Sequence, residues 1–150
     1  MNIRRVKQGA RLTLYNGIFM ILFGIFYAIF VQFNMKQNFN AISELWGFFA
    51  KFNPAITQLF LLFNILIGLF LISTGITIIH LSDFIIKRKD KMTWVTLFIS
   101  GIIAWGGLLL ISILFKNQIL IILSIVGWFS FVTGMLLPIK YYLEKSYREY

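Results

Sequence analysis

Four polar side chains in one long, largely apolar stretch are the first candidates for chemistry. They are Asn64, Ser73, Thr77 and His80, and between Phe52 and Ser82 only that histidine is ionisable. Amide, hydroxyl and imidazole groups in such a setting can bind an uncharged solute or line its path. For Asn64 we weigh this against a hydrogen bond between helices, which stabilises packing by about 1 kcal/mol. Of these two roles for Asn64, we expect the hydrogen bond between helices.

His80, the only histidine, precedes Asp83 by three residues. As an acid–base pair they lack a nucleophile placed by any recognisable motif, and one histidine with one carboxylate falls short of a zinc site. The chain has no cysteine, which removes thiolate chemistry and Cys-ligated metals, and it has no Walker, Rossmann, HExxH or GxSxG motif. We therefore expect no catalytic residue, no metal and no cofactor.

The composition places these residues in a membrane. Of the 150 residues, 59% are hydrophobic and 13% charged, which leaves more apolar surface than a soluble domain of this size can hide. The net charge is +9, but the basic residues flank the apolar runs, so we expect no nucleic acid partner. The expected partners are membrane lipids, other membrane subunits or a second copy of the chain.

Four apolar runs are long enough to cross a bilayer, which takes about 20 residues. We expect residues 1–150 to form a single domain, an all-α integral membrane four-helix transmembrane bundle with crossings at about 12–35, 54–82, 92–115 and 119–139. The short turn at 116–118 makes the third and fourth crossings an antiparallel hairpin. The second crossing carries small or polar residues on two opposite sides, which predicts a place in the centre of the bundle.

The first extracytoplasmic loop contains a further helical pattern. Apolar residues recur at steps of three and four between Phe39 and Phe52, with Glu44 and Lys51 off that face. The pattern predicts a short amphipathic helix lying flat in the membrane interface, where Trp46 is favoured. We expect it to anchor the end of the bundle, and the alternative is a lid or a partner surface.

Small residues predict where the crossings touch, because helices in lipid associate where their backbones can approach closely. Gly17 and Gly24 of the first crossing match Gly75 and Gly68 of the second in depth, so we expect these two helices to pack together. In the third crossing the predicted packing face is Thr93, Thr96, Ser100, Ala104 and Gly107. The glycines expected at helix contacts are Gly17, Gly24, Gly68, Gly75, Gly127 and Gly134.

The basic residues predict the threading. Eleven of the 14 Lys and Arg residues lie in the N-terminal segment, the middle loop or the tail. By the positive-inside rule both termini are then cytoplasmic, and we expect the membrane to be the plasma (cell) membrane. The four basic residues of the middle loop can also bind anionic lipid headgroups at about 1 kcal/mol each. They are Lys87, Arg88, Lys89 and Lys91.

No acidic side chain, lysine or arginine lies at bilayer depth, which argues against ion-coupled transport. We therefore expect a non-enzymatic small multi-pass membrane protein, an accessory or self-assembling subunit. The alternative is a channel or carrier for an uncharged or lipid-like solute, with Asn64, Ser73 and Thr77 along its path. An intramembrane enzyme acting on lipid through His80 and Asp83 is the weakest hypothesis. A cavity reaching Asn64 would favour the carrier, and a tight bundle would favour the subunit.

Overall fold

The computed structural model describes residues 3–43, 45–88 and 90–144, and over those ranges it contains only helices and their connections. The helices are α1 (Ile3–Ile29), α2 (Val31–Ser43), α3 (Trp46–Phe52), α4 (Pro54–Arg88), α5 (Lys91–Leu114), α6 (Gln118–Leu136) and α7 (Ile139–Glu144). Four of them, α1, α4, α5 and α6, are long and apolar enough to cross a membrane.

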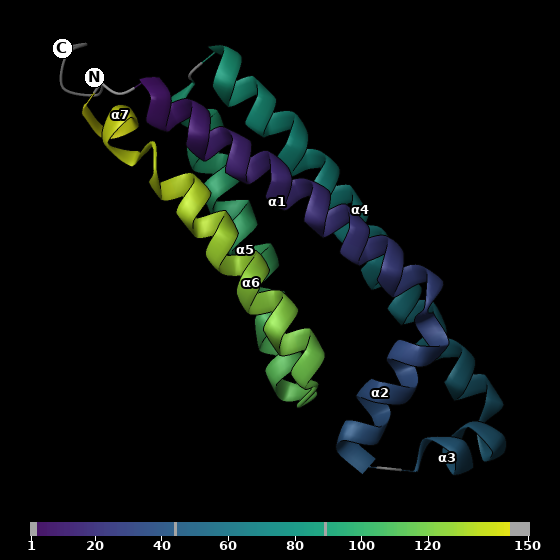
Figure 1. The fold of residues 1–150 in the computed structure, drawn as a ribbon. Coiled ribbons are helices and arrows are strands. Elements are labelled where there is room, and N and C mark those ends of the chain that lie inside the picture. The colour runs from purple at the N-terminus through teal and green to yellow at the C-terminus, as the bar shows by residue number, and fades with distance from the viewer. Residues whose placement is uncertain (1–2, 44, 89, 145–150) are drawn as a thin grey trace.

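The four long helices form two antiparallel pairs (Figure 1). α1 packs along α4, α5 and α6 form a hairpin, and the two pairs meet through contacts of α1 with α6 and of α4 with α5. The start of α1 and the end of α6 lie at one end of the bundle, whereas α2 and α3 lie at the other. The hairpin follows from the short turn, where Lys116 adopts a positive φ of 54°.

Glycines bring the backbones of α1 and α4 into contact. A Cβ atom on Gly75 would lie 2.7 Å from the carbonyl oxygen of Gly17, and a Cβ atom on Gly24 would lie 2.7 Å from that of Gly68. These are the pairs that the spacing predicts. Because each neighbouring atom is backbone, a side chain at these positions would push the two helices apart.

The prediction that the second crossing is central is wrong. In the apolar window of each helix, 39% of the residues are buried in α1 but only 17% in α4, so α1 is the more enclosed helix. The second polar stripe of α4 faces outward, with Ser73, Thr77 and His80 exposed. The Thr77 hydroxyl donates to the Ser73 carbonyl within the helix at 3.0 Å. A hydroxyl satisfied in this way needs no neighbouring helix.

The predicted packing face of the third crossing is not the face by which α5 packs within the chain. Thr96 and Ser100 are exposed, and α5 instead buries large residues such as Trp105. The indole of Trp105 fills the space that a side chain on Gly127 would occupy. The Phe131 ring fills the corresponding space at Gly101. An aromatic ring packed against a glycine buries more apolar area than a contact between small residues does.

The remaining predicted glycine, Gly134, joins the two pairs of helices. A Cβ atom there would lie 2.7 Å from Oγ1 of Thr13 and 3.2 Å from the carbonyl oxygen of Gly9, both in α1. α6 thus rests against α1 through Gly134 near one end. Gly9 carries a matching close contact that the sequence analysis did not single out.

The first long helix begins before the predicted crossing of 12–35 and ends short of its far limit, at Ile29, with a bend at Phe30. Backbone hydrogen bonds continue through the bend, from Phe30 N to Phe26 O at 2.9 Å and from Asn34 N to Phe30 O at 3.0 Å. After the bend, α2 turns back below the tip of the hairpin (Figure 1), and Asn38 of α2 accepts a hydrogen bond from Asn117 of the hairpin turn. The segment 39–52, for which one amphipathic helix was predicted, is divided between the end of α2 and α3, and Glu44 lies outside the described residues.

Candidate functional site

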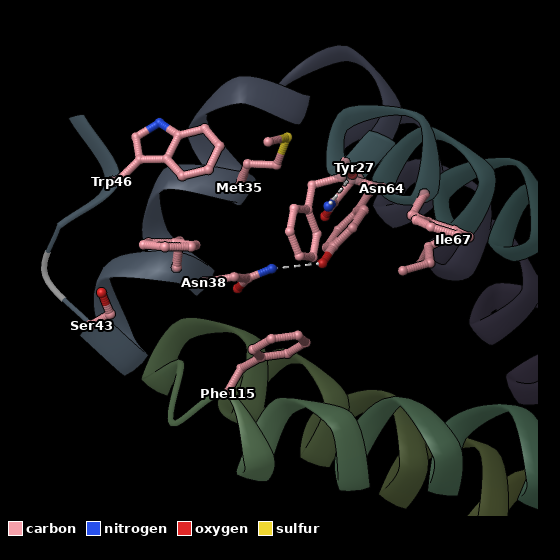
Figure 2. A pocket seen from close by; sticks show the side chains of 11 residues that line it. Tyr27, Met35, Asn38, Ser43, Trp46, Asn64, Ile67 and Phe115 are labelled. Carbon is pink, nitrogen blue, oxygen red and sulfur yellow. Dashed lines mark hydrogen bonds between the residues drawn. The ribbon is translucent and has the colours of Figure 1, made fainter. Parts of the chain in front are cut away.

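A cavity of about 490 Å³ lies where α2 and α3 cover the end of the bundle. Its walls come from α1, α2, α3, α4 and the residue after α5, as Figure 2 shows. The volume falls within the range of small-molecule sites. Of the lining side chains that the structure describes, six are aromatic and none is acidic or basic. The aromatic ones are Tyr27, Phe39, Trp46, Phe60, Phe63 and Phe115.

Ring contacts hold the covering helices in place. Phe39 of α2 packs against Trp46 and Phe49 of α3, with ring centroids 5.2 and 4.9 Å apart. Phe49 in turn meets Phe60 of α4 edge-on at 6.5 Å. Such pairs each contribute about 0.5–1.5 kcal/mol beyond their buried area. The apolar residues that recur in this segment thus join the helices that form the cavity wall.

Hydrogen-bonded side chains form one side of the cavity. Asn38 Nδ2 of α2 donates to the Tyr27 hydroxyl of α1 at 3.0 Å, a contact drawn in Figure 2. Asn117 Nδ2 donates to Asn38 Oδ1 at 2.9 Å, and Asn117 Oδ1 accepts from Leu120 N at 3.2 Å, which caps α6. One chain of amides therefore ties α2 to α1 and to the hairpin turn.

Asn64 lines the same cavity from α4 (Figure 2). Its Nδ2 donates to the Phe60 carbonyl of its own helix at 2.9 Å, so it makes no hydrogen bond to another helix within the described ranges. Ser73, Thr77 and His80, the other predicted ligand residues, lie exposed on the outer surface of α4. The structure therefore does not bring the four predicted residues together, and they do not line one path.

His80 is exposed and Asp83 is half-buried. In the part of the chain that the structure describes, no three His, Asp or Glu side chains come close enough to hold a metal ion.

Sequence reasoning missed the polar centre of the bundle. Asn16 of α1 is 2% exposed. Its Nδ2 donates to the Gly127 carbonyl at 2.8 Å and to the Ser130 hydroxyl at 2.7 Å. Its Oδ1 accepts from Trp105 Nε1 at 2.9 Å. The amide is well satisfied and holds three helices together, so it serves packing. In the sequence, Asn16 has the same mark as Asn64, because each is an amide side chain inside an apolar run.

The polar side of the cavity was missed as well. Asn34 and Asn38 are four residues apart and share a helical face, and both bond to the same residue. Asn34 Nδ2 donates to the Tyr27 carbonyl at 3.3 Å, and Asn38 donates to its hydroxyl. The spacing of the two asparagines was a usable signal. Their common partner became apparent only with the bend between α1 and α2.

The predicted headgroup cluster lies at the other end of the bundle. Lys89 and the side chains of Lys87 and Arg88 are outside the described residues, and Lys91 is exposed. Asp90 caps α5 by accepting from the backbone nitrogen of Thr93 at 2.8 Å and from its hydroxyl at 2.6 Å. These hydrogen bonds hold the pKa of the Asp90 carboxyl below its ordinary value. Comparisons of the chain with models of protein families, with curated proteins and with solved structures find no match.

Proposed function

We propose that this chain is a non-enzymatic multi-pass membrane protein that holds an uncharged, lipid-like solute in the cavity at the α2–α3 end. The observation that carries the proposal is a cavity of about 490 Å³ that reaches Asn64 and is lined, over the described ranges, by residues of which none is acidic or basic. A charged ligand there would lack a counter-charge, whereas an apolar one gains from the aromatic lining.

The membrane placement follows from charge and apolar length. The four long helices serve as the crossings, and both termini lie in the cytoplasm of a cell whose plasma membrane holds the protein. The cavity then opens near the outer leaflet. An interfacial position for α3 is supported by three apolar side chains that would otherwise face water. Leu45, Phe48 and Phe52 are 61%, 66% and 61% exposed.

Fluorescence of Trp46 tests the proposal, because this indole lines the cavity. The full chain is reconstituted in phosphatidylcholine nanodiscs and titrated with bromododecane, whose bromine quenches nearby indoles. We expect saturable quenching of the emission that Trp46→Phe removes. The matched control is Trp128→Phe, which removes an indole outside the cavity and should leave the saturable part intact. Quenching that only rises linearly with probe in the lipid would contradict solute binding.

A second candidate is a self-assembling or accessory subunit, which one surface of α5 supports. Thr96 and Ser100 are exposed, and a Cβ atom on Gly107 would meet nothing within 4 Å. Small residues that are not buried within the bundle allow the backbone of another helix to approach closely in lipid. Because the chain has no cysteine, Ser100→Cys should crosslink two copies in native membranes, whereas Ile122→Cys on α6 should not. Equal crosslinking at both positions would reject this surface.

A further inference from the structure

We infer that the solute is a neutral alcohol with a long hydrocarbon chain, bound with its hydroxyl group between Tyr27 and Asn64. This inference rests on the proposed function, because it specifies what the same cavity takes. It starts from the polar atoms of the wall and from the hydrogen bonds that they have left to make.

Tyr27 offers a donor. Its hydroxyl oxygen accepts from Asn38 Nδ2 at 3.0 Å, which turns the phenol proton away from that amide. No acceptor for this proton occurs among the residues that the structure describes. The Tyr27 hydroxyl reaches the cavity wall from α1 (Figure 2), so a ligand oxygen placed there would receive the proton.

Asn64 offers an acceptor. Its Nδ2 donates to the Phe60 carbonyl at 2.9 Å, and Oδ1, the acceptor atom of this amide, has hydrogen-bonding capacity left. Within the described ranges no donor reaches that oxygen. Tyr27 and Asn64 both line the cavity (Figure 2). One donor and one acceptor in the wall of one cavity match a hydroxyl group, which accepts and donates at once.

The lack of charge decides against other head groups. Among the wall residues that the structure describes, none is acidic or basic, and a carboxylate or an ammonium group without a counter-charge in such a place is costly. A bare hydrocarbon would fit the rings but leave the phenol proton and the amide oxygen unpaired. An alcohol is the head group that satisfies both atoms.

The aromatic side chains set the direction of the hydrocarbon chain. Trp46 lies well away from Asn64 across the cavity in Figure 2, with Met35 beside it. Phe60 and Phe63 supply further apolar wall. With its hydroxyl at Tyr27, the chain of the alcohol therefore runs toward Trp46.

The test compares three probes of equal chain length in phosphatidylcholine nanodiscs that carry the full chain. They are bromododecanol and bromododecanoate, each with bromine on the terminal carbon, and bromododecane. Quenching of Trp46 is followed against the mole fraction of probe in the lipid. Bromododecanol should half-saturate at an about fivefold to 25-fold lower fraction than bromododecane, since each net hydrogen bond is worth about fivefold. Bromododecanoate should give no saturable quenching.

Asn64→Leu removes the acceptor without breaking a contact to another helix. We expect it to raise the half-saturating fraction of bromododecanol about fivefold and to leave that of bromododecane unchanged. Thr77→Val is the matched control, because it removes a hydroxyl of the same helix that bonds only within α4. If Asn64→Leu does not unfold cooperatively, the inference is tested with Tyr27→Phe and with the probe series on the parent protein.

The outcomes separate the two proposals. Equal saturable quenching by the alcohol and the alkane would overturn the inference and leave solute binding intact. A loss of saturation with every probe would overturn the proposed function itself. Tighter binding of bromododecanoate than of bromododecanol would reject a neutral head group.

Discussion

Trp105 of α5 donates its indole N–H to Oδ1 of Asn16 of α1 at 2.9 Å, across 89 residues of sequence. The same amide donates to the Gly127 carbonyl of α6 at 2.8 Å. Both side chains are buried, and the Trp105 side chain is 0% exposed. Three crossings therefore share one hydrogen-bonded centre, which fixes their rotation about their own axes.

Asn16→Leu should destabilise the bundle by about 1–3 kcal/mol, because it leaves the buried indole N–H of Trp105 without its partner and removes the hydrogen bonds from α1 to α6. Asn64→Leu is the matched control, since that amide bonds only within α4 and its loss should cost less than about 1 kcal/mol. Thermal unfolding in a mild detergent measures both. Equal melting of the two variants would mean that the Asn16 contact does not hold the helices together.

Gly75→Ala should lower the melting temperature, because the new methyl group would lie 2.7 Å from the Gly17 carbonyl oxygen. Overpacking of this kind costs about 1–3 kcal/mol. Gly107→Ala is the control, since its Cβ atom would meet nothing within 4 Å, and alanine favours helix by about 1 kcal/mol over glycine. The contact between α1 and α4 is disproved if both variants melt at or above the temperature of the parent protein.

Asn117→Asp should separate two roles of one side chain. An aspartate still accepts from Leu120 N and caps α6, but it has no N–H for Asn38 Oδ1. We expect near-parental stability with a looser α2, whereas Asn117→Ala should also lose about 1 kcal/mol of capping. Spin labels at Gln37 and Gln118, both exposed, report the distance between α2 and the turn. An unchanged distance distribution in both variants would argue against the tie.

Tyr142 should make stability fall at alkaline pH. Its hydroxyl is buried without a partner among the described residues, and burial, with smaller contributions from Tyr141 and Asp90, raises its pKa from 10.0 to about 12. The folded protein then keeps a proton that the unfolded chain releases, so this contribution is complete below about pH 10 and is lost as pH rises through about 12.

Tyr142→Phe should remove that part of the alkaline loss and cost little at neutral pH, because no hydrogen bond disappears. Melting temperatures followed across this pH range compare the variant with the parent protein. A variant profile that matches the parent would place the Tyr142 hydroxyl in water.

The threading can be tested without altering any charge, because the chain has no cysteine. Gln118→Cys at the hairpin turn should react with a membrane-impermeant maleimide in intact cells. Met92→Cys beside the basic loop should react only after permeabilisation. Labelling of Met92→Cys in intact cells would reverse the topology and move the cavity to the cytoplasmic side.

The sequence by itself determined the local features. Four apolar runs and a short turn after Phe115 were sufficient to predict four long helices and one hairpin, because length and hydropathy are properties of a single segment. The match between Gly17 and Gly75 was also predictable. Helical spacing places small residues on one face, and close backbone contact in lipid needs such residues.

The tertiary structure alone decided which helix is central and what the polar groups do. In lipid-facing helices the outer surface is as apolar as the buried one, so hydropathy does not mark the buried side. The second stripe of α4 was therefore mistaken for a contact, although Thr77 bonds within its own helix. Asn16 was overlooked, because its partners come from α5 and α6. The cavity likewise exists only where the bend at Phe30 brings α2 and α3 over Asn64 and Tyr27.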